Sequence, residues 1–556
     1  MRIKYFLFGA AALALGACSN EENESISPSK QQTKEAYVQV TVKLPSASAT
    51  RSETGNGGTT AEGVEIGQTT ENTISKFQIV LIDKDGKIAK SDTITTGGNV
   101  PGSTDTYTTD PIKVQSLVAG TKYKTYILVN DSVDVRADDA YFTVSDADLT
   151  KTIAKANKFL MTGMGVDSVA TGTDVTAYTK ESPLYLGTVS VERAVARFDY
   201  KDYNDNGNVY VLAPGASSTD PAELQVKLTG IALTNVSPTF YMTKRVSADG
   251  TNASWTLGGA ETPTNYVVDH NWADKTLAKW QAGTKAPFLN TYATGTGVTY
   301  KDLSSLSTDD NVWSSGSTYD GGGYKIWTYC TENTIQADPT VNQINGLSTG
   351  VIFKGEISGT MKAFNTTDAA FKATAGNKVY IFDGNVLGPW TSVVACKNAD
   401  FSTITDPTKR AEMEALQTAL KSAFVTQGLS ETDDATLNPS AKLAAAGFTR
   451  YTADSAGKYY AYYVYWNRHN DNGVSNVMGP MEFAVVRNNV YKLAVTEIMR
   501  LGHPKDPTKP TPGTDPDPDP DPDEPDPEDP DEDPSIYLKV AVKVVPWTVR
   551  VNNITF

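Results

Sequence analysis

The sequence has few of the residues on which metal sites, catalytic triads and nucleic-acid binding depend. Its 556 residues include three histidines and three cysteines, and 65 acidic residues outnumber 49 basic ones. So few histidines leave little basis for a histidine metal site or a His-dependent triad. An acidic surplus argues against a general nucleic-acid binder, which needs Lys and Arg to neutralise phosphates. The motifs HExxH, GxSxG and GxxxxGK[ST] are missing too, so we predict no catalytic residue, metal or cofactor.

Long hydrophobic runs are also missing. Downstream of residue 18 no stretch has 18 consecutive apolar residues, and the apolar residues 5–15 are too few to span a bilayer, which takes roughly 20. They follow Arg2 and Lys4 and lead into Leu-Gly-Ala before Cys18. Small residues before a cysteine resemble a bacterial lipobox, so we predict a lipoprotein signal peptide over residues 1–18. Cys18 would then carry a lipid that tethers the exported chain; the alternative is an ordinary secretory signal with a chance cysteine.

Export leaves two other cysteines, Cys330 and Cys396. In an oxidising compartment they could form a disulfide across a long loop, worth up to ~4 kcal/mol by the chain-entropy estimate. Two buried thiols are an equally supported alternative. Neither cysteine has CxxC spacing, so a zinc or redox site is not predicted.

Most of the chain is typical of β structure. Short runs rich in β-branched and aromatic residues recur between Gly, Asn, Asp and Pro, as at residues 77–82, 123–129, 350–357, 459–466 and 490–495. This spacing predicts a mainly β fold of sandwich domains. Two helices are expected. Asp406-Pro407 begins one that Gly428 ends, and the other places Leu149, Ile153, Ala156 and Leu160 on one face.

Two polar stretches resemble the start of a calcium loop. Residues 202–207 (DYNDNG) have Ala213 at the twelfth position instead of Glu, and residues 470–473 (NDNG) are similar. We interpret both as turns, and the first as a domain boundary.

An alternating strand precedes a flexible stretch near the N-terminus. Val38, Val40, Val42 and Leu44 share one face, as in a half-buried strand. Small residues then surround Arg51, which makes an accessible site for a trypsin-like protease, with Ser52 as the first residue of the product. Cleavage there would remove both the lipid anchor and this strand, and would leave an apolar groove with unpaired backbone groups.

The C-terminus has a similar strand behind an acidic spacer. Residues 515–534 contain 12 acids and eight prolines, which leaves four of the sixteen net negative charges for the rest of the chain. As polyproline II this spacer would span about 60 Å. Alternate apolar residues follow it, and at Pro546 their phase slips by one, which predicts a bulge or break. The residues that would face a sheet are Ile536, Leu538, Val540, Val542, Val544, Trp547, Val549 and Val551.

Such a strand could fold back onto its own domain or complete the sheet of a neighbouring molecule. Head-to-tail exchange of this kind does not close on itself, so it would build a filament. Trp547 would then be an anchor in the neighbour's groove, although it could also stack on a carbohydrate.

Four segments resemble the fimbrillins, the type V pilins of Bacteroidales outer membranes, and their Mfa-type major subunits especially. They are residues 191–197 (VERAVAR), 329–334 (YCTENT), 485–491 (VVRNNVY) and 544–547 (VVPW). The resemblance implies two transthyretin-like β-sandwich domains with a few short helices and a C-terminal donor strand. It also implies a surface pilin that is exported as a lipoprotein, cut after an arginine and polymerised by strand exchange in support of adhesion.

By position, Cys18 would be the lipidation site and Arg51 the processing site. The expected organisation is a signal peptide (1–18), a propeptide with the removable strand (19–51), two sandwich domains (52–203 and 204–504), an acidic linker (505–534) and the donor strand (535–556). The partners implied are further copies of the chain, anchor and tip subunits, an Arg-specific protease and, before cleavage, the outer membrane; the mature chain would lie in an extracellular fimbrium.

Other interpretations remain open on the sequence alone. With 27 Tyr and eight Trp, the chain could be a surface lipoprotein that binds glycans, whereas a secreted hydrolase lacks motif support. Arg193 and Arg197 could form an anion site, but we expect outward-facing arginines on a strand near the domain boundary.

Overall fold

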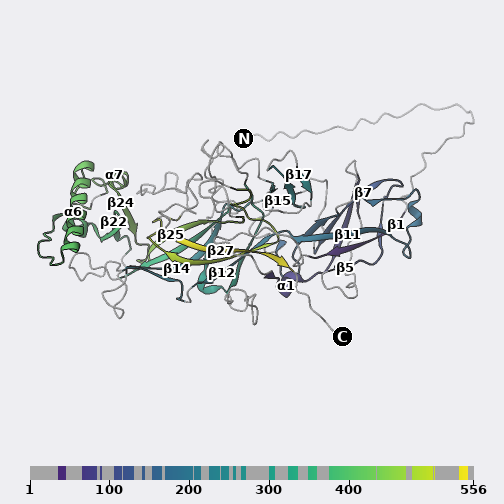
Figure 1. Ribbon diagram of the computed structural model, residues 1–556, viewed down its shortest axis with the longest axis horizontal. Coiled ribbons are helices and arrows are strands. Elements are labelled where there is room, and N and C mark those ends of the chain that lie inside the picture. The colour runs from purple at the N-terminus through teal and green to yellow at the C-terminus, as the bar shows by residue number, and fades with distance from the viewer. Residues whose placement is uncertain are drawn as a thin grey trace, which may run out of the picture.

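The computed structural model is an elongated, mainly β molecule (Figure 1), which confirms the fold class predicted from the sequence. The structure describes residues 35–44, 65–83, 88–90, 106–115, 117–130, 141–143, 153–165, 169–203, 206–213, 224–237, 239–249, 255–257, 265–270, 300–306, 324–335, 349–359, 375–433, 435–470, 479–504, 506 and 538–548. Among these residues, no helix is both long enough and apolar enough to cross a bilayer.

One end of the molecule is a nine-stranded sheet that curls around its own core. The order along its main path is β4-β3-β7-β9-β11-β1-β5, with β10 beside β7 and β6 beside β1. The bounds are β1 Ala36–Lys43, β3 Phe77–Asp83, β4 Ile88–Lys90, β5 Thr106–Thr108, β6 Ile112–Val114, β7 Lys122–Val129, β9 Met161–Met164, β10 Val169–Ala170 and β11 Leu184–Arg193. A short 3-10 helix, η2 (Val175–Ala177), lies in the connection before β11.

The middle of the molecule is a sandwich of two five-stranded sheets. One sheet has the order β2-β27-β26-β12-β20 and the other β13-β14-β21-β25, with β19 beside β14. The first contains β2 Glu65–Ile66, β12 Ala196–Asp202, β20 Lys325–Cys330, β26 Asn489–Ile498 and β27 Leu538–Thr548; the second contains β13 Val209–Ala213, β14 Leu224–Thr234, β19 Lys301–Asp302, β21 Gly350–Ser358 and β25 Tyr459–Trp466. The 3-10 helix η4 (Leu303–Ser305) follows β19.

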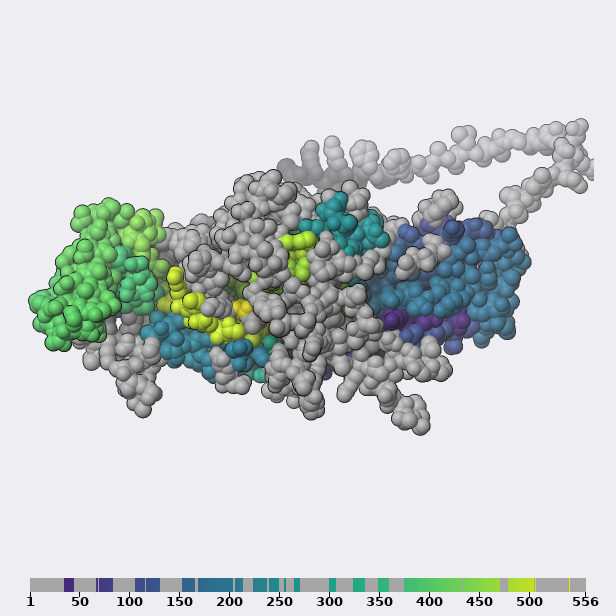
Figure 2. Space-filling view, viewed as in Figure 1, coloured from purple at the N-terminus to yellow at the C-terminus, as the bar shows by residue number. Residues whose placement is uncertain are grey.

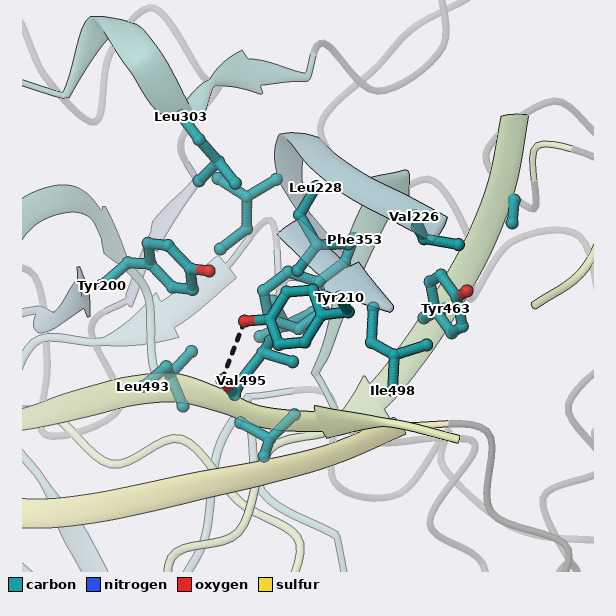
Figure 3. Packing of buried hydrophobic residues seen from close by; sticks show 14 of the residues in the cluster. Tyr200, Tyr210, Val226, Leu228, Leu303, Phe353, Tyr463, Leu493, Val495 and Ile498 are labelled. Atoms are coloured by element: carbon teal, nitrogen blue, oxygen red, sulfur yellow. Dashed lines mark hydrogen bonds between the residues drawn. The ribbon is translucent and has the colours of Figure 1, made fainter. Parts of the chain in front are cut away.

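Aromatic and aliphatic side chains fill the space between these two sheets. Figure 3 shows Tyr210 among Val226, Leu228 and Phe353, with its hydroxyl donating to the carbonyl oxygen of Val495 at 2.9 Å. That hydrogen bond links β13 to β26, so it ties the two sheets together across an otherwise apolar core.

A small helical unit forms the opposite end from the nine-stranded sheet (Figures 1 and 2). Strands β22 Lys378–Phe382, β23 Asn385–Gly388 and β24 Phe448–Thr452 form its sheet, and helices α5 Trp390–Asn398, α6 Pro407–Gln427 and α7 Ser440–Ala445 cover it. Its core is a separate cluster around Trp390, Leu420 and Phe424. The sequence prediction did not separate this unit from the surrounding range 204–504.

The predicted caps of α6 are confirmed. The Asp406 side chain accepts from the backbone N–H groups of Thr408 and Lys409, Pro407 is the first helical residue, and Gly428 ends the helix with a φ of 58°. Glycine adopts this left-handed conformation without a Cβ penalty.

The second predicted helix, over residues 149–160, does not continue beyond Ile153 in the part that the structure describes. Asn157 has a φ of 64° within a turn, and the Leu160 N–H donates to the Ile153 carbonyl oxygen at 2.8 Å. A left-handed residue cannot continue an α-helix. The apolar spacing arises instead because Ile153, Phe159 and Leu160 pack in one cluster with Phe240.

The chain passes from the first sheet to the sandwich between β11 and β12. Ala194 and Val195 form this connection, so the change of sheet comes earlier in the chain than the expected boundary at 203/204. The described residues of the polar stretch at that expected boundary, 202–203 and 206–207, lie between β12 and β13, where Asp202 Oδ2 accepts from the Asn208 N–H at 2.9 Å. This stretch joins two strands of the sandwich.

Further short elements connect the two parts. They are α1 Thr69–Asn72, the pair β8 Tyr141–Thr143 with β15 Thr239–Tyr241, and the three-stranded sheet of β16 Arg245–Ser247, β17 Trp255–Leu257 and β18 Tyr266–Val267. Met242 and Trp255 from this region pack on Val80 and Tyr126 of the nine-stranded sheet. Both faces of β3 and β7 are therefore covered.

Candidate assembly site

Strand β1 lies between other strands on both of its edges. It pairs in parallel with β11 on one side, and on the other it is antiparallel to β6 along its first half and to β5 along its second half. The four residues assigned to a removable strand, Val38, Val40, Val42 and Leu44, are at most 3% exposed and contribute to the core of this sheet. Taking β1 away would therefore leave a groove between β11 and the β5–β6 edge.

Thr109 bridges the point where the groove wall changes from β6 to β5. Its hydroxyl oxygen accepts from the Val40 N–H at 3.2 Å, and its own N–H donates to the Val40 carbonyl oxygen at 3.0 Å. The Gln39 side chain donates to the Thr109 carbonyl oxygen at 2.8 Å. The middle of β1 is thus held by one threonine where neither short strand reaches it.

A bulge in β11 faces the same point of β1. Gln39 is opposite Tyr185 and Thr41 is opposite Thr188, so β11 has one more residue than β1 in this interval. Gly187 takes up the extra length with a φ of 84°. On the outer face, Tyr185 donates to the Thr41 hydroxyl at 2.9 Å, and that hydroxyl lies 2.9 Å from the Thr108 hydroxyl.

The predicted processing sites lie outside the described residues. These are the lipidation site Cys18 and the cleavage site at Arg51 and Ser52. All of β1 precedes Arg51 in the chain, whereas the strands that surround it all follow it. A cut after Arg51 would thus leave β1 held in its groove only by noncovalent contacts.

The C-terminal strand is paired within its own molecule. β27 runs antiparallel to β26 from Leu538 opposite Ile498 to Pro546 opposite Asn489, and its far end pairs in parallel with β2. Val540 is buried in the sandwich core. Of the other predicted donor residues, Leu538, Val542, Val544 and Trp547 lie in β27, while Ile536, Val549 and Val551 fall outside the described residues.

The break expected at Pro546 is not present, because β27 is one strand from Leu538 to Thr548. Pro546 pairs with the first residue of β26, and the next residue pairs with Glu65 of β2. The proline, which has no N–H, therefore lies where β27 changes neighbours, so its missing donor falls at the end of a ladder. The register shift lies elsewhere, between Val495 and Glu497 of β26.

Arg193 and Arg197 do not face outward, as the sequence analysis expected; both are fully buried. Arg197 forms ion pairs with Asp199 at 2.8 Å and Glu71 at 3.0 Å. Tyr329 donates to the same Glu71 carboxylate at 2.7 Å. Burial lowers the pKa of Arg193 to about 9, although the charge of Glu71 opposes that shift. We call Glu71, Arg193, Arg197, Asp199 and Tyr329 the junction cluster.

The junction cluster joins the two parts of the molecule. Glu71 comes from α1, Arg193 from the end of β11, and the other three from β12 and β20 of the sandwich. Arg193 also contacts Asn72 of α1 and Asn488 beside β26. The charged groups of the junction cluster have their counter-charges within the protein, so the cluster has a structural role and does not have the form of an open anion site.

Cys330 and Cys396 are not joined by a disulfide; both are buried thiols. Cys330 lies in the sandwich core and Cys396 in the core of the helical unit. Burial raises the pKa of the Cys396 thiol to about 11. Such a thiol stays protonated at neutral pH and is a poor nucleophile.

No group of three His, Cys, Asp or Glu side chains in the described part of the chain is placed to hold a metal ion. The groove residues Thr109, Tyr185 and Gly187 were missed by the sequence analysis. Gly187 had a usable signal, because a glycine inside a strand pattern often marks a bulge. Thr109 had none, since its partner Val40 lies far away in the sequence.

Comparison with known proteins identifies the C-terminal region. Residues 458–553 match the family of the major fimbrial subunit protein type IV, fimbrillin, C-terminal. This range contains β25, β26 and β27, and hence the strand pair on which the candidate assembly site depends. No curated protein matches the chain.

Solved structures with a similar course of the chain include three fimbrial proteins of Porphyromonas gingivalis. The fimbrilin fimA of strain W83 is 13% identical, with 93% of this chain and 99% of that one covered and a TM-score of 0.34. The tip fimbrial protein Mfa3 is 9% identical, with 92% and 100% covered and a TM-score of 0.33. The fimbrial anchor protein Mfa2 is 8% identical, with 60% and 84% covered and a TM-score of 0.22.

These TM-scores are below 0.5, so the assignment rests on the match in sequence. Within the chain, residues 458–553 match the C-terminal region of the fimbrillins, a family of major fimbrial subunit proteins.

Proposed function

We propose that the chain is a stalk subunit of a bacterial surface fimbrium that polymerises by exchanging strands. In this proposal the precursor is exported, lipidated at Cys18 and held at the outer membrane. An Arg-specific protease cuts after Arg51, β1 leaves its groove, and residues 536–551 of another copy take its place. The released subunit then becomes part of an extracellular filament that supports adhesion.

The observation that carries this proposal is the position of β1. It is a central strand, paired on both edges and buried on one face, yet it precedes the protease site. A central strand normally depends on its covalent neighbours to stay in place. Here a single backbone cut would separate a core strand from the rest of the fold, which is a useful arrangement if the strand is meant to be exchanged.

The energetics explain why cleavage would be needed. Burying a Val or Leu side chain stabilises by ~1.5–3 kcal/mol, so the four core residues of β1 contribute roughly 6–12 kcal/mol before hydrogen bonds are counted. While β1 belongs to the same chain, this contribution keeps the groove closed. After cleavage β1 is a separate peptide, it loses the high effective concentration of a tethered strand, and another strand can compete for the groove.

The position of β27 supports its role as the donor. It lies towards the edge of its sheet, and among the described strands the two-residue strand β2 alone lies beyond it. Leaving that edge would uncover β26, but β26 would remain paired with β12. The acidic, proline-rich residues 515–534 precede it and, by their composition, favour an extended spacer that reaches a neighbour.

The β1 groove and the C-terminal strand β27 together favour a stalk subunit. Such a subunit needs a groove that its own strand can leave and a strand that it can insert into a neighbouring copy. We propose that anchor and tip subunits of the same fimbrium terminate the filament at its two ends. Adhesion would then be a property of the assembled filament.

A reversible covalent lock on β1 tests the proposal. The hydroxyl oxygens of Thr41 and Thr108 lie 2.9 Å apart, so cysteines at these positions are well placed for a disulfide. In a Cys18→Ser background, we expect oxidised Thr41→Cys/Thr108→Cys protein to be cut after Arg51 and to remain monomeric. Reducing agent should restore polymerisation, as followed by light scattering and electron microscopy.

Each single cysteine variant is the matched control and should polymerise in either redox state. Arg51→Ala should remain uncut and monomeric. Polymerisation of the oxidised double variant at the wild-type rate would show that β1 does not leave its groove, and would overturn the proposal.

A further inference from the structure

We propose that the incoming C-terminal strand occupies the β1 groove in a single register, in which residue n + 500 of one copy takes the place of residue n of the next. This inference rests on the proposed function. It adds which donor residue lies at each position of the groove and in which direction the strand runs.

The first argument is a correspondence between the two strands. Residues 36–44 read AYVQVTVKL and residues 536–544 read IYLKVAVKV, with identical residues at four of the nine positions. The identities are Tyr37 with Tyr537, Val40 with Val540, Val42 with Val542 and Lys43 with Lys543. Both strands are matched in the same N-to-C direction, so the donor would run parallel to β11, as β1 does.

A slip by one residue is excluded by the burial of β1. Ala36, Val38, Val40 and Val42 are fully buried, whereas Gln39 and Lys43 are partly exposed. Shifting the donor by one position would place Lys539 or Lys543 in the apolar core. An unpaired buried ammonium group is too costly for this to compete.

A slip by two residues keeps the apolar face inward, but it brings a proline into the groove. In one direction Pro534 would take the place of Ala36, which pairs with Val114 of β6. In the other direction Pro546 would take the buried site of Leu44. In the proposed register both prolines lie just beyond the nine matched positions, where a missing N–H costs nothing.

The middle of the groove accepts the donor in this register. Val540 replaces Val40, so its N–H and carbonyl can make the two hydrogen bonds to Thr109 that β1 makes. Lys539 replaces Gln39, and its amine can donate to the Thr109 carbonyl as the Gln39 amide does. Ala541 replaces Thr41 and loses the contacts of that hydroxyl with Tyr185 and Thr108, but Tyr185 is 50% exposed, so water can take the place of the lost hydroxyl.

The donor also buries at least as much apolar material as β1. On the inward face Ile536 replaces Ala36, Leu538 replaces Val38 and Val544 replaces Leu44, a net gain of three carbon atoms. Since the stabilisation follows the apolar area removed from water, the exchange does not lose hydrophobic burial.

Cysteine pairing measures the register directly. Thr41 is opposite Thr108 in the precursor, so in the proposed register Ala541 of one copy lies opposite Thr108 of the next. We expect Ala541→Cys/Thr108→Cys, in a Cys18→Ser background, to form covalent multimers on oxidation after cleavage and polymerisation. On a non-reducing gel these should appear as a ladder that reductant collapses to monomer.

Two matched variants report the competing arrangements. Lys543→Cys/Thr108→Cys would cross-link after a slip of two residues in one direction. Lys539→Cys/Thr108→Cys would cross-link after the opposite slip, or if the donor entered in reverse about Val540. We expect each to give at least tenfold less cross-linked product than Ala541→Cys/Thr108→Cys. Cys330 and Cys396 are buried, so they add little background.

The outcomes separate the register from the strand exchange itself. If polymers form and a Lys variant gives the ladder, or if Ala541→Cys gives none, the register is wrong while strand exchange stands. If wild-type protein does not polymerise after cleavage at Arg51, the proposed function fails and the register fails with it.

Discussion

At the scale of residues, buried charged side chains join the nine-stranded sheet to the sandwich. Arg197 is fully buried and its guanidinium lies between Asp199 and Glu71, which come from different parts of the chain. Burial and the neighbouring Glu71 carboxylate raise the pKa of the Tyr329 hydroxyl, so this hydroxyl stays protonated and donates to Glu71. The joint therefore depends on each charge having its partner.

Arg197→Leu should destabilise the protein strongly. It leaves the buried carboxylates of Glu71 and Asp199 without their cation, and breaking a buried pair from one side typically costs ~3–5 kcal/mol. Chemical unfolding followed by circular dichroism would measure the loss. Lys458→Met, which removes a partly exposed ion pair with Glu356, is the control and should change little. A loss at Arg197 no larger than the control would contradict a structural role for the cluster.

The residues of this cluster show a limit of sequence reasoning. The sequence analysis expected a strand here with Arg193 and Arg197 facing outward, whereas both side chains are buried. Their carboxylate and phenol partners lie in α1, β12 and β20, and the first and last of these are far from them in sequence. A buried charge can be recognised only when its counter-charges are known.

At the scale of elements, β1 and β27 differ in how much of the fold they complete. β1 is a central strand, whereas β27 is flanked by β26 on one edge and by the short strand β2 on the other. Without β27, the sandwich core would keep its packing between the sheet of β26, β12 and β20 and the facing sheet. The two strands should therefore respond differently to deletion.

Deleting residues 535–556 should leave a folded monomer that no longer elongates. Stability should fall, because Val540 leaves the core and one edge of β26 is uncovered. Circular dichroism and size exclusion would check the fold, and electron microscopy after cleavage at Arg51 would check for filaments. A truncated chain that still elongates would exclude β27 as the donor, and one that unfolds would make β27 an essential strand of its own domain.

Several elements could be predicted because their signals are local. The runs at residues 77–82, 123–129, 350–357, 459–466 and 490–495 lie in β3, β7, β21, β25 and β26, and the caps of α6 were identified correctly. Helix α5 and the loss of the helix near residue 157 were not foreseen. Helix α5 depends on its packing against the sheet of the helical unit, and near residue 157 a turn interrupts the apolar spacing that predicted a helix.

At the scale of the whole molecule, the separate cores imply parts that can be perturbed separately. The helical unit has its own cluster at the end of the molecule away from β1, and contacts the sandwich through β24 and β25 (Figure 1). Neither the groove of β1 nor strand β27 includes a residue of this unit.

Leu420→Ala should therefore weaken the helical unit without blocking assembly. Leu420 is fully buried between α6 and the sheet, and removing a buried leucine typically costs ~2–5 kcal/mol. Hydrogen exchange should show loss of protection confined to residues 378–452, while polymerisation after cleavage continues. Val425→Ala, at a position 83% exposed on the same helix, is the control. Failure of Leu420→Ala to polymerise would show that this unit takes part in assembly.

The sequence by itself determined the features that depend on order along the chain. A β-rich body, an alternating strand before Arg51 and its counterpart behind an acidic spacer can all be read from residue types and spacing, which also predict an export signal ahead of Cys18. The tertiary structure alone decided that β1 is a central strand, that β27 pairs with β26 of its own molecule, and that Arg193 and Arg197 are buried. The reason is physical: alternation shows that a strand has one buried face, but its neighbours are chosen by pairing and packing between residues far apart in the chain.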